Sequence, residues 1–284
     1  MVYDIVVIGA GIAGLAAASD LRRQGKSVLV IDKGRGVGGR MATRRVSTSR
    51  MDHGAQFLTV RDPRFESCLA PLFESGELFP WSHGFPLWRN GKITVRPKGH
   101  PRFALRSGMS TLPKFFSQGL ELALGDAVTE IFCEESGQWQ ITLKNGQHHL
   151  ANILLVNTPP AQLLPLAGSF LDETIRLKIS AAEMQPTWAV FGQVDHDPDF
   201  GAVALELEDH PVLRWVARDH TRRSPGQPPS LVVHCNEPWS RANLEAAPEV
   251  VAQDVARALS ELLKVTFATA PEVHRWRFAT PNGE

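Results

Sequence analysis

The chain begins with a short apolar strand that is followed directly by three closely spaced glycines. Few folds are compatible with this pattern. The strand is predicted over Ile5–Ile8, which has no polar interruption, as in a parallel strand buried on both faces. Gly9, Gly11 and Gly14 follow at once. The first glycine permits a tight turn, the second lets a pyrophosphate approach the backbone, and the third lets a helix pack against the strand. The pattern therefore predicts a phosphate-binding strand–turn–helix unit.

The residues after the glycines extend this unit. A helix predicted over about residues 12–24 would direct its free N–H groups and its positive dipole end at a phosphate, and Gly25 is placed to end it. Val28–Ile31 forms the returning strand and delivers Asp32 beside Gly9, where a carboxylate can accept both hydroxyls of an adenosine ribose. A glycine-rich helix start in some other α/β protein would leave that acid unexplained. We therefore predict a dinucleotide site.

A second glycine motif separates the two common dinucleotides, NAD and FAD. Gly38–Met41 comes shortly after Asp32, so a glycine doublet and Arg40 offer a second anion contact. FAD binds in an extended form with its pyrophosphate near this bend, and a guanidinium can pair with it as a planar fork. No second glycine fingerprint follows a strand later in the sequence, so no separate pyridine-nucleotide domain is predicted. We expect FAD, bound non-covalently.

Composition sets the outer limits. A chain of 284 residues suggests about two domains, and its formal net charge of zero indicates neither nucleic acid nor an anionic membrane as a partner. Cys68, Cys133 and Cys235 are scattered, which indicates a reducing compartment and neither a disulfide framework nor a metal site. The most apolar run, Ile5–Ala18, is too short to span a bilayer. We expect a cytoplasmic protein.

Five stretches, spread over nearly the whole chain, carry a family resemblance. They are Asp32–Met41, Asp52–Phe57, Ser107–Ser110, Pro186–Val190 and His274–Trp276. Together they resemble the flavin-containing amine oxidase superfamily, and most closely its small bacterial renalase-like oxidases. The resemblance implies an α/β fold of the amine oxidase or p-hydroxybenzoate hydroxylase type. In such a fold a Rossmann-like FAD-binding domain is interleaved with a smaller α+β substrate domain.

On this resemblance the two domains share the chain in five segments. The FAD-binding domain is expected over residues 1–61, 107–160 and 272–284, and the substrate domain over residues 62–106 and 161–271. The sequence stops at Glu284, where relatives continue with a strand, a Gly-Asp turn and a last helix that cover the FAD phosphates. We therefore expect the FAD-binding domain to be incomplete, as in a chain truncated at its C-terminus.

The resemblance also implies cofactor contacts outside the glycine turn. Gly54, Ala55, Gln56 and Phe57 are implied to run along the flavin ring, although an αL turn at Gly54 with Phe57 in the core would explain the same sequence. Val128 matches a position whose main chain meets the adenine edge. The full set of expected cofactor-binding residues is Gly9, Gly11, Ile12, Ala13, Gly14, Asp32, Lys33, Gly39, Arg40, Met41, Gly54, Ala55, Gln56, Phe57, Val128 and Thr158.

Four residues of the later sequence are candidates for a substrate pocket. His234 and Trp276 lie in segments that resemble parts of renalase-like proteins facing the flavin ring, but a hydrogen-bonded core histidine and a domain-interface aromatic residue would fit as well. Trp188 and Arg96 are the other two, and a tryptophan on a strand is more often a core residue. No catalytic acid, base or nucleophile is expected, because flavin chemistry needs none.

Several connecting segments complete the expected structure. Val46–Arg50 is expected to be a polar loop, and Thr221–Ser230, rich in Pro, Arg and Ser, a solvated one. Ser110 is the expected N-cap of a helix whose apolar side extends to Leu120. Residues 249–264 predict an amphipathic helix, and Asn90-Gly91 predicts a hairpin turn.

The resemblance to bacterial renalases implies a specific activity, the oxidation of misreduced isomers of NAD(P)H. The expected substrates are 2- or 6-dihydro-NAD(P), the products β-NAD(P)+ and hydrogen peroxide, and the oxidant dioxygen. Hydride would pass from the substrate directly to the flavin, and aromatic walls suit a stacked dihydronicotinamide. An amine oxidase or a carotenoid-type desaturase on the same scaffold is the nearest alternative. A non-catalytic chain that binds FAD poorly is the alternative from another class.

Overall fold

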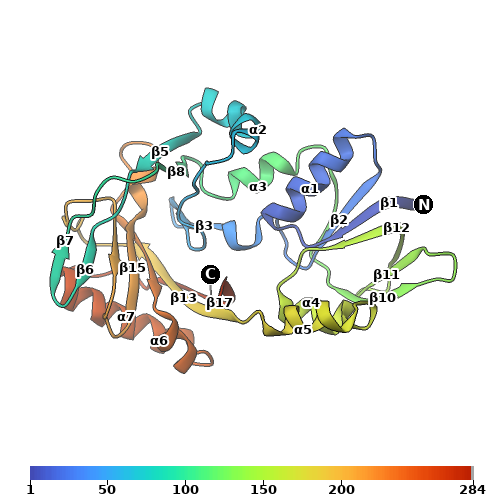
Figure 1. The fold of residues 1–284 in the computed structure, drawn as a ribbon. Coiled ribbons are helices and arrows are strands. Elements are labelled where there is room, and N and C mark those ends of the chain that lie inside the picture. Colours follow the sequence, from blue (N-terminus) through green and yellow to red (C-terminus); the bar gives the residue numbers. More distant parts are fainter. Residues whose placement is uncertain (283–284) are drawn as a thin grey trace. The chain divides into compact units, whose positions relative to one another are not determined.

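The computed structural model describes residues 1–282, which divide into two compact units (Figure 1). Unit 1 comprises Met1–Met41, Ser110–Met184 and residues 281–282, and unit 2 comprises Ala42–Met109 and Gln185–Thr280. The units are interleaved along the sequence, as predicted. Unit 2 contains the larger share of the chain, although the sequence-based expectation made it the smaller. The boundaries of the two units also differ from those of the five expected segments. The assignment of those segments to FAD binding and to substrate binding stays a prediction.

Unit 1 is built on a six-stranded sheet in the order β10-β11-β12-β1-β2-β9. Its strands are β1 (Val2–Ile8), β2 (Val28–Asp32), β9 (Glu121–Leu124), β10 (Val128–Cys133), β11 (Trp139–Leu143) and β12 (His148–Val156). The four strands from β12 to β9 pair in parallel, whereas β10, β11 and β12 pair antiparallel. This is the α/β arrangement of a Rossmann-like domain, and it places the carboxyl ends of β1, β2 and β12 at one edge.

Helices cover both faces of this sheet, which explains the continuous apolar run of β1. Val7 lies against Gly14 of α1 (Ile12–Arg23), whereas Val6 and Ile8 share a cluster with Leu166 of α4 (Pro160–Ala167). Both β1 and the adjacent β2 are therefore buried on two sides, as predicted for parallel strands. The remaining helical elements of the unit are η1 (Gly39–Met41), α3 (Thr111–Phe116), η2 (Gly168–Phe170) and α5 (Glu173–Ala181).

The helix expected to extend to Leu120 is shorter than predicted. Ser110 occupies the N-cap position without a side-chain capping bond, and α3 ends at Phe116. Gly119 then adopts a positive φ of 72°, and the chain enters β9, which the sequence analysis missed. The apolar residues at 120, 122 and 124 alternate as in a strand, and this period of two was hidden by the preceding helical pattern.

Unit 2 is built on a seven-stranded sheet in the order β17-β13-β16-β15-β14-β6-β7. Its strands are β6 (Leu87–Arg89), β7 (Lys92–Thr94), β13 (Met184–Gln193), β14 (Ala204–Leu207), β15 (Leu213–Arg218), β16 (Ser230–Cys235) and β17 (Glu272–Pro281). One face packs against α7 (Pro248–Leu263), whose Val251, Val255 and Leu259 are buried in a cluster with Trp188 and Val190 of β13. Val250 of the expected apolar stripe is 48% exposed, because it lies beside rather than on that face.

Smaller elements surround this sheet. They are the hairpin of β3 (Thr43–Val46) and β4 (Ser49–Asp52), the pair β5 (Leu78–Ser82) and β8 (Arg102–Leu105), α2 (Pro63–Glu74), η3 (Asp219–Arg222) and α6 (Glu237–Ala242). The hairpin between β6 and β7 turns at Asn90-Gly91, where both residues have positive φ, so that prediction is confirmed. Among the described residues, no helix has the length and apolar character needed to cross a membrane.

Two loop predictions are wrong. Val46–Arg50 is not a polar loop but the end of β3, a two-residue turn and the start of β4. Ser47 in the turn adopts a positive φ of 55°. Thr221–Ser230 is not solvated at its two ends, since Arg222, Arg223 and Ser230 are buried. Charged side chains are rarely buried unless they are paired. These two arginines are buried because each forms an ion pair with a buried carboxylate.

Candidate cofactor and substrate sites

The glycine turn after β1 is closed by the main chain around it. Gly9 has a φ of 110°, and a Cβ built there would lie 2.5 Å from the carbonyl oxygen of Asn157. A Cβ on Gly14 would lie 2.4 Å from the carbonyl oxygen of Gly9 and 2.8 Å from the side-chain nitrogen of Asn157. Neither position accepts a side chain. At Gly11 the nearest atom to such a Cβ is 3.4 Å away, so this glycine keeps the backbone open toward the outside of the turn.

Asn157 is a residue of this turn that the sequence analysis did not assign to the site. Its backbone N–H donates to the Ile8 carbonyl at 2.8 Å, so it follows β12 directly alongside the end of β1. Its side chain lies over Gly11 and Gly14. The only signal in the sequence was a polar residue at the end of a predicted strand, and its place depended on the pairing of β12 with β1.

Asp32 at the end of β2 is held in a defined orientation by two backbone N–H groups. Ala10 donates to Oδ2 at 2.7 Å and Gly34 donates to Oδ1 at 2.6 Å. A carboxylate has about four acceptor sites, so each oxygen of Asp32 keeps capacity for a further donor. The geometry therefore fits a carboxylate that binds the two hydroxyls of a ribose.

The second glycine motif, Gly38–Met41, begins directly beside the first glycine turn. Gly38 donates to the Ala10 carbonyl at 2.8 Å and forms a bridge with Gly11, and its φ is 118°. The turn is tight, since a Cβ on Gly38 would lie 2.9 Å from Pro113. The predicted residues Gly39, Arg40 and Met41 form η1 directly after it, with Arg40 exposed and Met41 buried. The structure thus brings the two predicted anion-contact motifs together within unit 1.

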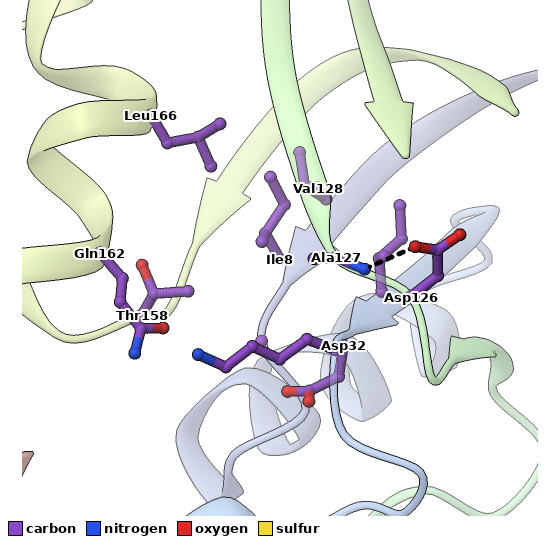
Figure 2. Close-up of a pocket in the computed structure, with 11 residues that line it drawn as sticks. Ile8, Asp32, Asp126, Ala127, Val128, Thr158, Gln162 and Leu166 are labelled. Atoms are coloured by element: carbon purple, nitrogen blue, oxygen red, sulfur yellow. Dashed lines mark hydrogen bonds between the residues drawn. The ribbon is translucent and has the colours of Figure 1, made fainter. Parts of the chain in front are cut away.

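A cavity of about 110 Å³ opens beside Asp32 (Figure 2). It is lined by Ile8, Gly9, Ile31, Asp32, Lys33, Asp126, Ala127, Val128, Thr158, Gln162 and Leu166. A single water needs roughly 10–15 Å³ on the same measure, so the cavity accommodates a group the size of a heteroaromatic ring. Five of the residues predicted from the sequence are in this lining, namely Gly9, Asp32, Lys33, Val128 and Thr158.

One buried polar atom in this lining fits a bound group. The Thr158 hydroxyl has no hydrogen-bond partner among the described residues, although its oxygen is buried. An unpaired buried hydroxyl costs roughly 1–3 kcal/mol, so such an atom marks a place where a ligand atom belongs. Together with the oriented Asp32 and the two glycine turns, this makes unit 1 fit the adenosine and phosphates of FAD.

In unit 2, the two foremost substrate-pocket candidates meet at one backbone carbonyl, that of His53. Trp276 Nε1 donates to this oxygen at 2.9 Å, and His234 Nε2 lies 3.0 Å from it. A carbonyl only accepts, so we assign the His234 proton to Nε2. The His53 ring is stacked between Phe191 and Trp276, with centroid separations of 5.0 and 5.3 Å. His274 meets the same ring edge-on at 4.7 Å.

The imidazoles of this cluster are uncharged near neutral pH. Burial, followed by the nearby His274, Arg44 and His234, lowers the pKa of His53 to about 3. Burial and Arg214 lower the pKa of His234 to about 3. Burial and Arg44 lower that of His274 to about 4. We call His53, His234, His274 and Trp276 the histidine cluster; it is neutral and aromatic, with His53 and His234 buried and His274 and Trp276 partly buried.

The structure does not bring the other two pocket candidates to this cluster. His234 pairs with Ala189 across β16 and β13, so Trp188 next to it points to the opposite face of the sheet. There Trp188 is 3% exposed in the α7 core, and its Nε1 donates to the Asn243 carbonyl at 3.0 Å. Arg96 is exposed and forms an ion pair with Glu206 at 2.5 Å. Neither side chain shares a contact with the histidine cluster.

The segment that follows His53 is fixed by a buried ionic network. Gln56 donates to the carbonyls of Asp52 and Gly54 and accepts from Trp215 and Arg222, so its amide is fully used. Phe57 is partly buried and packs against Phe85 and Trp215, but Gly54 does not adopt the αL turn that the alternative interpretation expected. Gly54 and Ala55 are partly buried between these anchors.

Asp52, Asp219, Arg222 and Arg223 form the ionic part of this network. Arg223 Nη2 lies 2.7 Å from an Asp52 oxygen and 2.8 Å from an Asp219 oxygen, and Arg222 pairs with Asp219 as well. Burial alone would raise the pKa of Asp219, but the two guanidinium groups outweigh it and hold this pKa below its usual value. Asp52 also accepts from Thr43 and from the Met109 N–H. The network locks the 52–57 segment into the core of unit 2.

The chain matches two known families over adjacent regions. Residues 7–72 match a family described as an NAD(P)-binding Rossmann-like domain, and residues 69–283 match the flavin containing amine oxidoreductases. Among curated proteins, AofH of Mycobacterium tuberculosis, provisionally named a flavin-containing monoamine oxidase, is 39% identical over 117 residues. That match covers 41% of this chain and 23% of AofH, so the chain spans less than a quarter of that relative.

Solved structures show the same fold. Reduced UDP-galactopyranose mutase superposes with a TM-score of 0.79 over 98% of this chain and 84% of the mutase, at 12% identity. A protein of Exiguobacterium sp. 255-15, provisionally named protoporphyrinogen oxidase, gives 0.80 over 98% of this chain and 87% of that protein, at 13% identity. At such identities the likeness concerns the fold alone. The second family match, which extends over most of the sequence, settles the question of kinship: this chain belongs to the flavin containing amine oxidoreductases, whose cofactor is FAD.

Proposed function

We propose that the protein is an FAD-dependent oxidase of dihydronicotinamide nucleotides, which converts 2- or 6-dihydro-NAD(P) to β-NAD(P)+ while dioxygen is reduced to hydrogen peroxide. The observation that carries this proposal is the histidine cluster of unit 2, in which the partly buried rings of His274 and Trp276 are the neutral aromatic groups that a substrate could meet. A dihydronicotinamide is a flat, uncharged ring with one carboxamide, and stacking with a few hydrogen bonds would suit it. FAD, when bound, supplies the acceptance of a hydride and its transfer as electrons to dioxygen.

The residues of this chain would then bind and orient FAD and the substrate. In unit 1, Gly11, Gly39 and Arg40 would contact the pyrophosphate and Asp32 the ribose, with Ile12, Ala13, Gly14, Lys33 and Met41 beside them. In unit 2, Gly54–Phe57 would contact the flavin, held by the ionic network and by the His53 carbonyl. Because the pKa of His53, His234 and His274 is low, these rings hold no second proton near pH 7, and the substrate ring would meet an uncharged cluster.

The test uses the protein reconstituted with FAD under anaerobic conditions. We expect 2- or 6-dihydro-NAD(P) to bleach the flavin absorbance within a mixing experiment, and primary or secondary amines to leave it unchanged. Admission of dioxygen should restore the absorbance and release hydrogen peroxide. Bleaching by amines but not by the dihydronicotinamides would overturn the proposal. A protein that takes up no FAD would favour the non-catalytic alternative.

A second candidate is an amine oxidase, and one observation favours it. The 117 residues that match AofH are 39% identical, which is higher than expected from the fold alone. Protonated amines are cations, so an amine site would need acceptors or aromatic faces to receive them. The histidine cluster provides the faces but no carboxylate among its own side chains, and for this reason we rank the amine second.

A further inference from the structure

One arginine of the unit 2 sheet lacks a partner among the described residues. Arg214 lies on β15, the middle strand of this seven-stranded sheet (Figure 1), and it is partly buried. No hydrogen bond or ion pair joins its guanidinium to any other residue of the described range 1–282. Arg218, Arg222 and Arg223 follow it in the sequence, and each forms an ion pair with an aspartate. The protein therefore shields the charge of Arg214 from water without compensating it.

The backbone of β15 is irregular at this residue. Its pairing with β16 shifts register between Leu213 and Trp215, so Arg214 is the extra residue of a β-bulge. Bulges are frequent beside functional sites, where they re-aim a side chain. Trp215 pairs with His234 on one side and with Glu206 of β14 on the other, so these three lie in one row on one face of the sheet. The bulge thus places Arg214 beside the row that contains His234 of the histidine cluster.

The charge of Arg214 is felt by its neighbours, but none of them neutralises it. Burial, followed by the nearby Arg214, lowers the pKa of His234. Arg214 also interacts with Cys235 and Glu206. Burial raises the pKa of the Cys235 thiol, so it stays uncharged, and the Glu206 carboxylate is paired with Arg96 at 2.5 Å. Burial lowers the pKa of Arg214 itself, yet a guanidinium stays protonated near pH 7. Arg214 is therefore a fixed cation next to the histidine cluster.

A phosphate would complete this arrangement. A charge that is removed from water without a counterion is unfavourable, and the planar fork of an arginine matches the oxygen atoms of a phosphate in pairs. The proposed substrate carries a phosphate close to its nicotinamide ring, separated from it by one ribose. A protonated amine would instead be repelled by the same guanidinium. The charge of Arg214 thus favours a nucleotide over an amine at this site.

We propose that Arg214 binds the substrate phosphate nearest the nicotinamide ring, so that the smallest ligand selected by unit 2 is a nicotinamide mononucleotide. The ring would lie at the histidine cluster, and the phosphate would lie at the bulge of β15. The identity of the ring rests on the proposed function, whereas the phosphate rests on Arg214 alone. Binding can be measured without turnover, so the two can be tested apart.

The experiment compares two ligands that differ only in this phosphate, oxidised nicotinamide mononucleotide and nicotinamide riboside. Their binding to the full-length protein reconstituted with FAD is measured by isothermal calorimetry. We expect wild type to bind the mononucleotide about ten- to a hundredfold more tightly than the riboside, from charge-assisted hydrogen bonds to the phosphate. Arg214→Met should abolish this preference and leave riboside binding unchanged. Arg214→Lys keeps the charge but not the planar fork, so it should retain part of the preference.

Arg257→Met is the matched control, because Arg257 is exposed on α7 and forms its ion pair with Asp254 there. It should keep the wild-type preference, and thermal melting of each variant checks folding. Three results would overturn the proposal: wild type that binds the two ligands equally or binds neither, Arg214→Met that keeps the preference, or Arg257→Met that loses it equally.

The proposed function can fail separately. A phosphate preference that depends on Arg214, in a protein whose flavin is not bleached by the dihydronicotinamides, would refute the proposed function and leave the phosphate site standing. Bleaching by the dihydronicotinamides without that preference would refute this inference alone.

Discussion

At the scale of single residues, the glycine turn of unit 1 has almost no tolerance for a side chain. Gly14 is confined between the Gly9 carbonyl and the Asn157 amide, and both are fixed by the pairing of β1 with its neighbours. The backbone atoms that a Cβ would meet cannot move without breaking the turn. This residue therefore couples the packing of α1 to the shape of the phosphate site.

Replacement of Gly14 by alanine should abolish FAD uptake. The new Cβ would overlap a backbone oxygen, and overpacking of this kind costs about 1–3 kcal/mol in addition to the distortion of the turn. The measurement is the ratio of flavin to protein absorbance after reconstitution and gel filtration. Gly36→Ala is the control, because nothing lies within 4 Å of a Cβ there. Equal FAD content in both variants would show that the turn is more pliable than its geometry indicates.

Sequence reasoning predicted those residues of the candidate site whose position follows from their own neighbours in the chain. Each of the glycines and Asp32 is explained by a strand, a turn or a helix within about 30 residues. Asn157 and Gln162 were missed because they reach the site through the pairing of β12 with β1, across more than 140 positions. His53 was missed because its importance depends on two donors, His234 and Trp276, that lie far along the sequence.

At the scale of elements, η3 joins β15 to the rest of unit 2 through charges rather than through apolar packing. Its Arg222 stacks over Trp81 with 4.7 Å between the guanidinium carbon and the ring centroid, and Arg223 reaches Asp52 of β4 and the Leu105 carbonyl of β8. Composition alone marked this segment as a solvated loop. Only the positions of Asp52 and Asp219 in three dimensions explain why two adjacent arginines are buried, so the sequence could not have predicted it.

Replacement of Arg223 by methionine should destabilise unit 2 strongly. The change leaves Asp52 and Asp219 with uncompensated buried charge, and removal of one partner of a buried ion pair typically costs about 3–5 kcal/mol. Urea unfolding followed by tryptophan fluorescence measures the effect as a lower midpoint. Arg64→Met provides the control, since its ion pair with Asp62 is exposed, and it should leave the midpoint unchanged. A midpoint for Arg223→Met equal to that of wild type would contradict the role of the network.

At the scale of the whole molecule, the histidine cluster makes stability depend on pH in a defined direction. The pKa of His53 and His234 is lowered to about 3 in the folded state, from a usual value near 6.5. Between these values the unfolded chain binds protons that the folded chain does not. Acid therefore favours unfolding, and the stability contributed by the neutral rings is complete above about pH 6.5 and lost as the pH falls toward 3.

We expect each of these two histidines to add about 1.4 kcal/mol of unfolding free energy per pH unit between roughly pH 6 and 4. His234→Asn keeps a donor for the His53 carbonyl but removes one titrating ring. Its stability, measured by urea unfolding from pH 4.5 to 7, should therefore change less steeply with pH than that of wild type. His148→Asn, at an exposed position on β12, should keep the wild-type slope. Identical slopes for all three proteins would refute this account.

The chain makes two excursions into unit 2, over residues 42–109 and 185–280, and the residues at the two ends of each excursion lie close together. Thr43 lies so near Gly108 that a Cβ there would be 2.5 Å from its hydroxyl oxygen, and the Asn282 N–H donates to the Glu183 carbonyl at 2.7 Å. Each excursion thus leaves and returns at nearly one point. The two excursions share one sheet, because β6 of the first pairs with β14 of the second, so exchanging one alone would disrupt unit 2. Exchanging both together need not disturb the strands of the nucleotide sheet, which offers protein engineers a direct way to graft new substrate chemistry onto an existing nucleotide-binding unit.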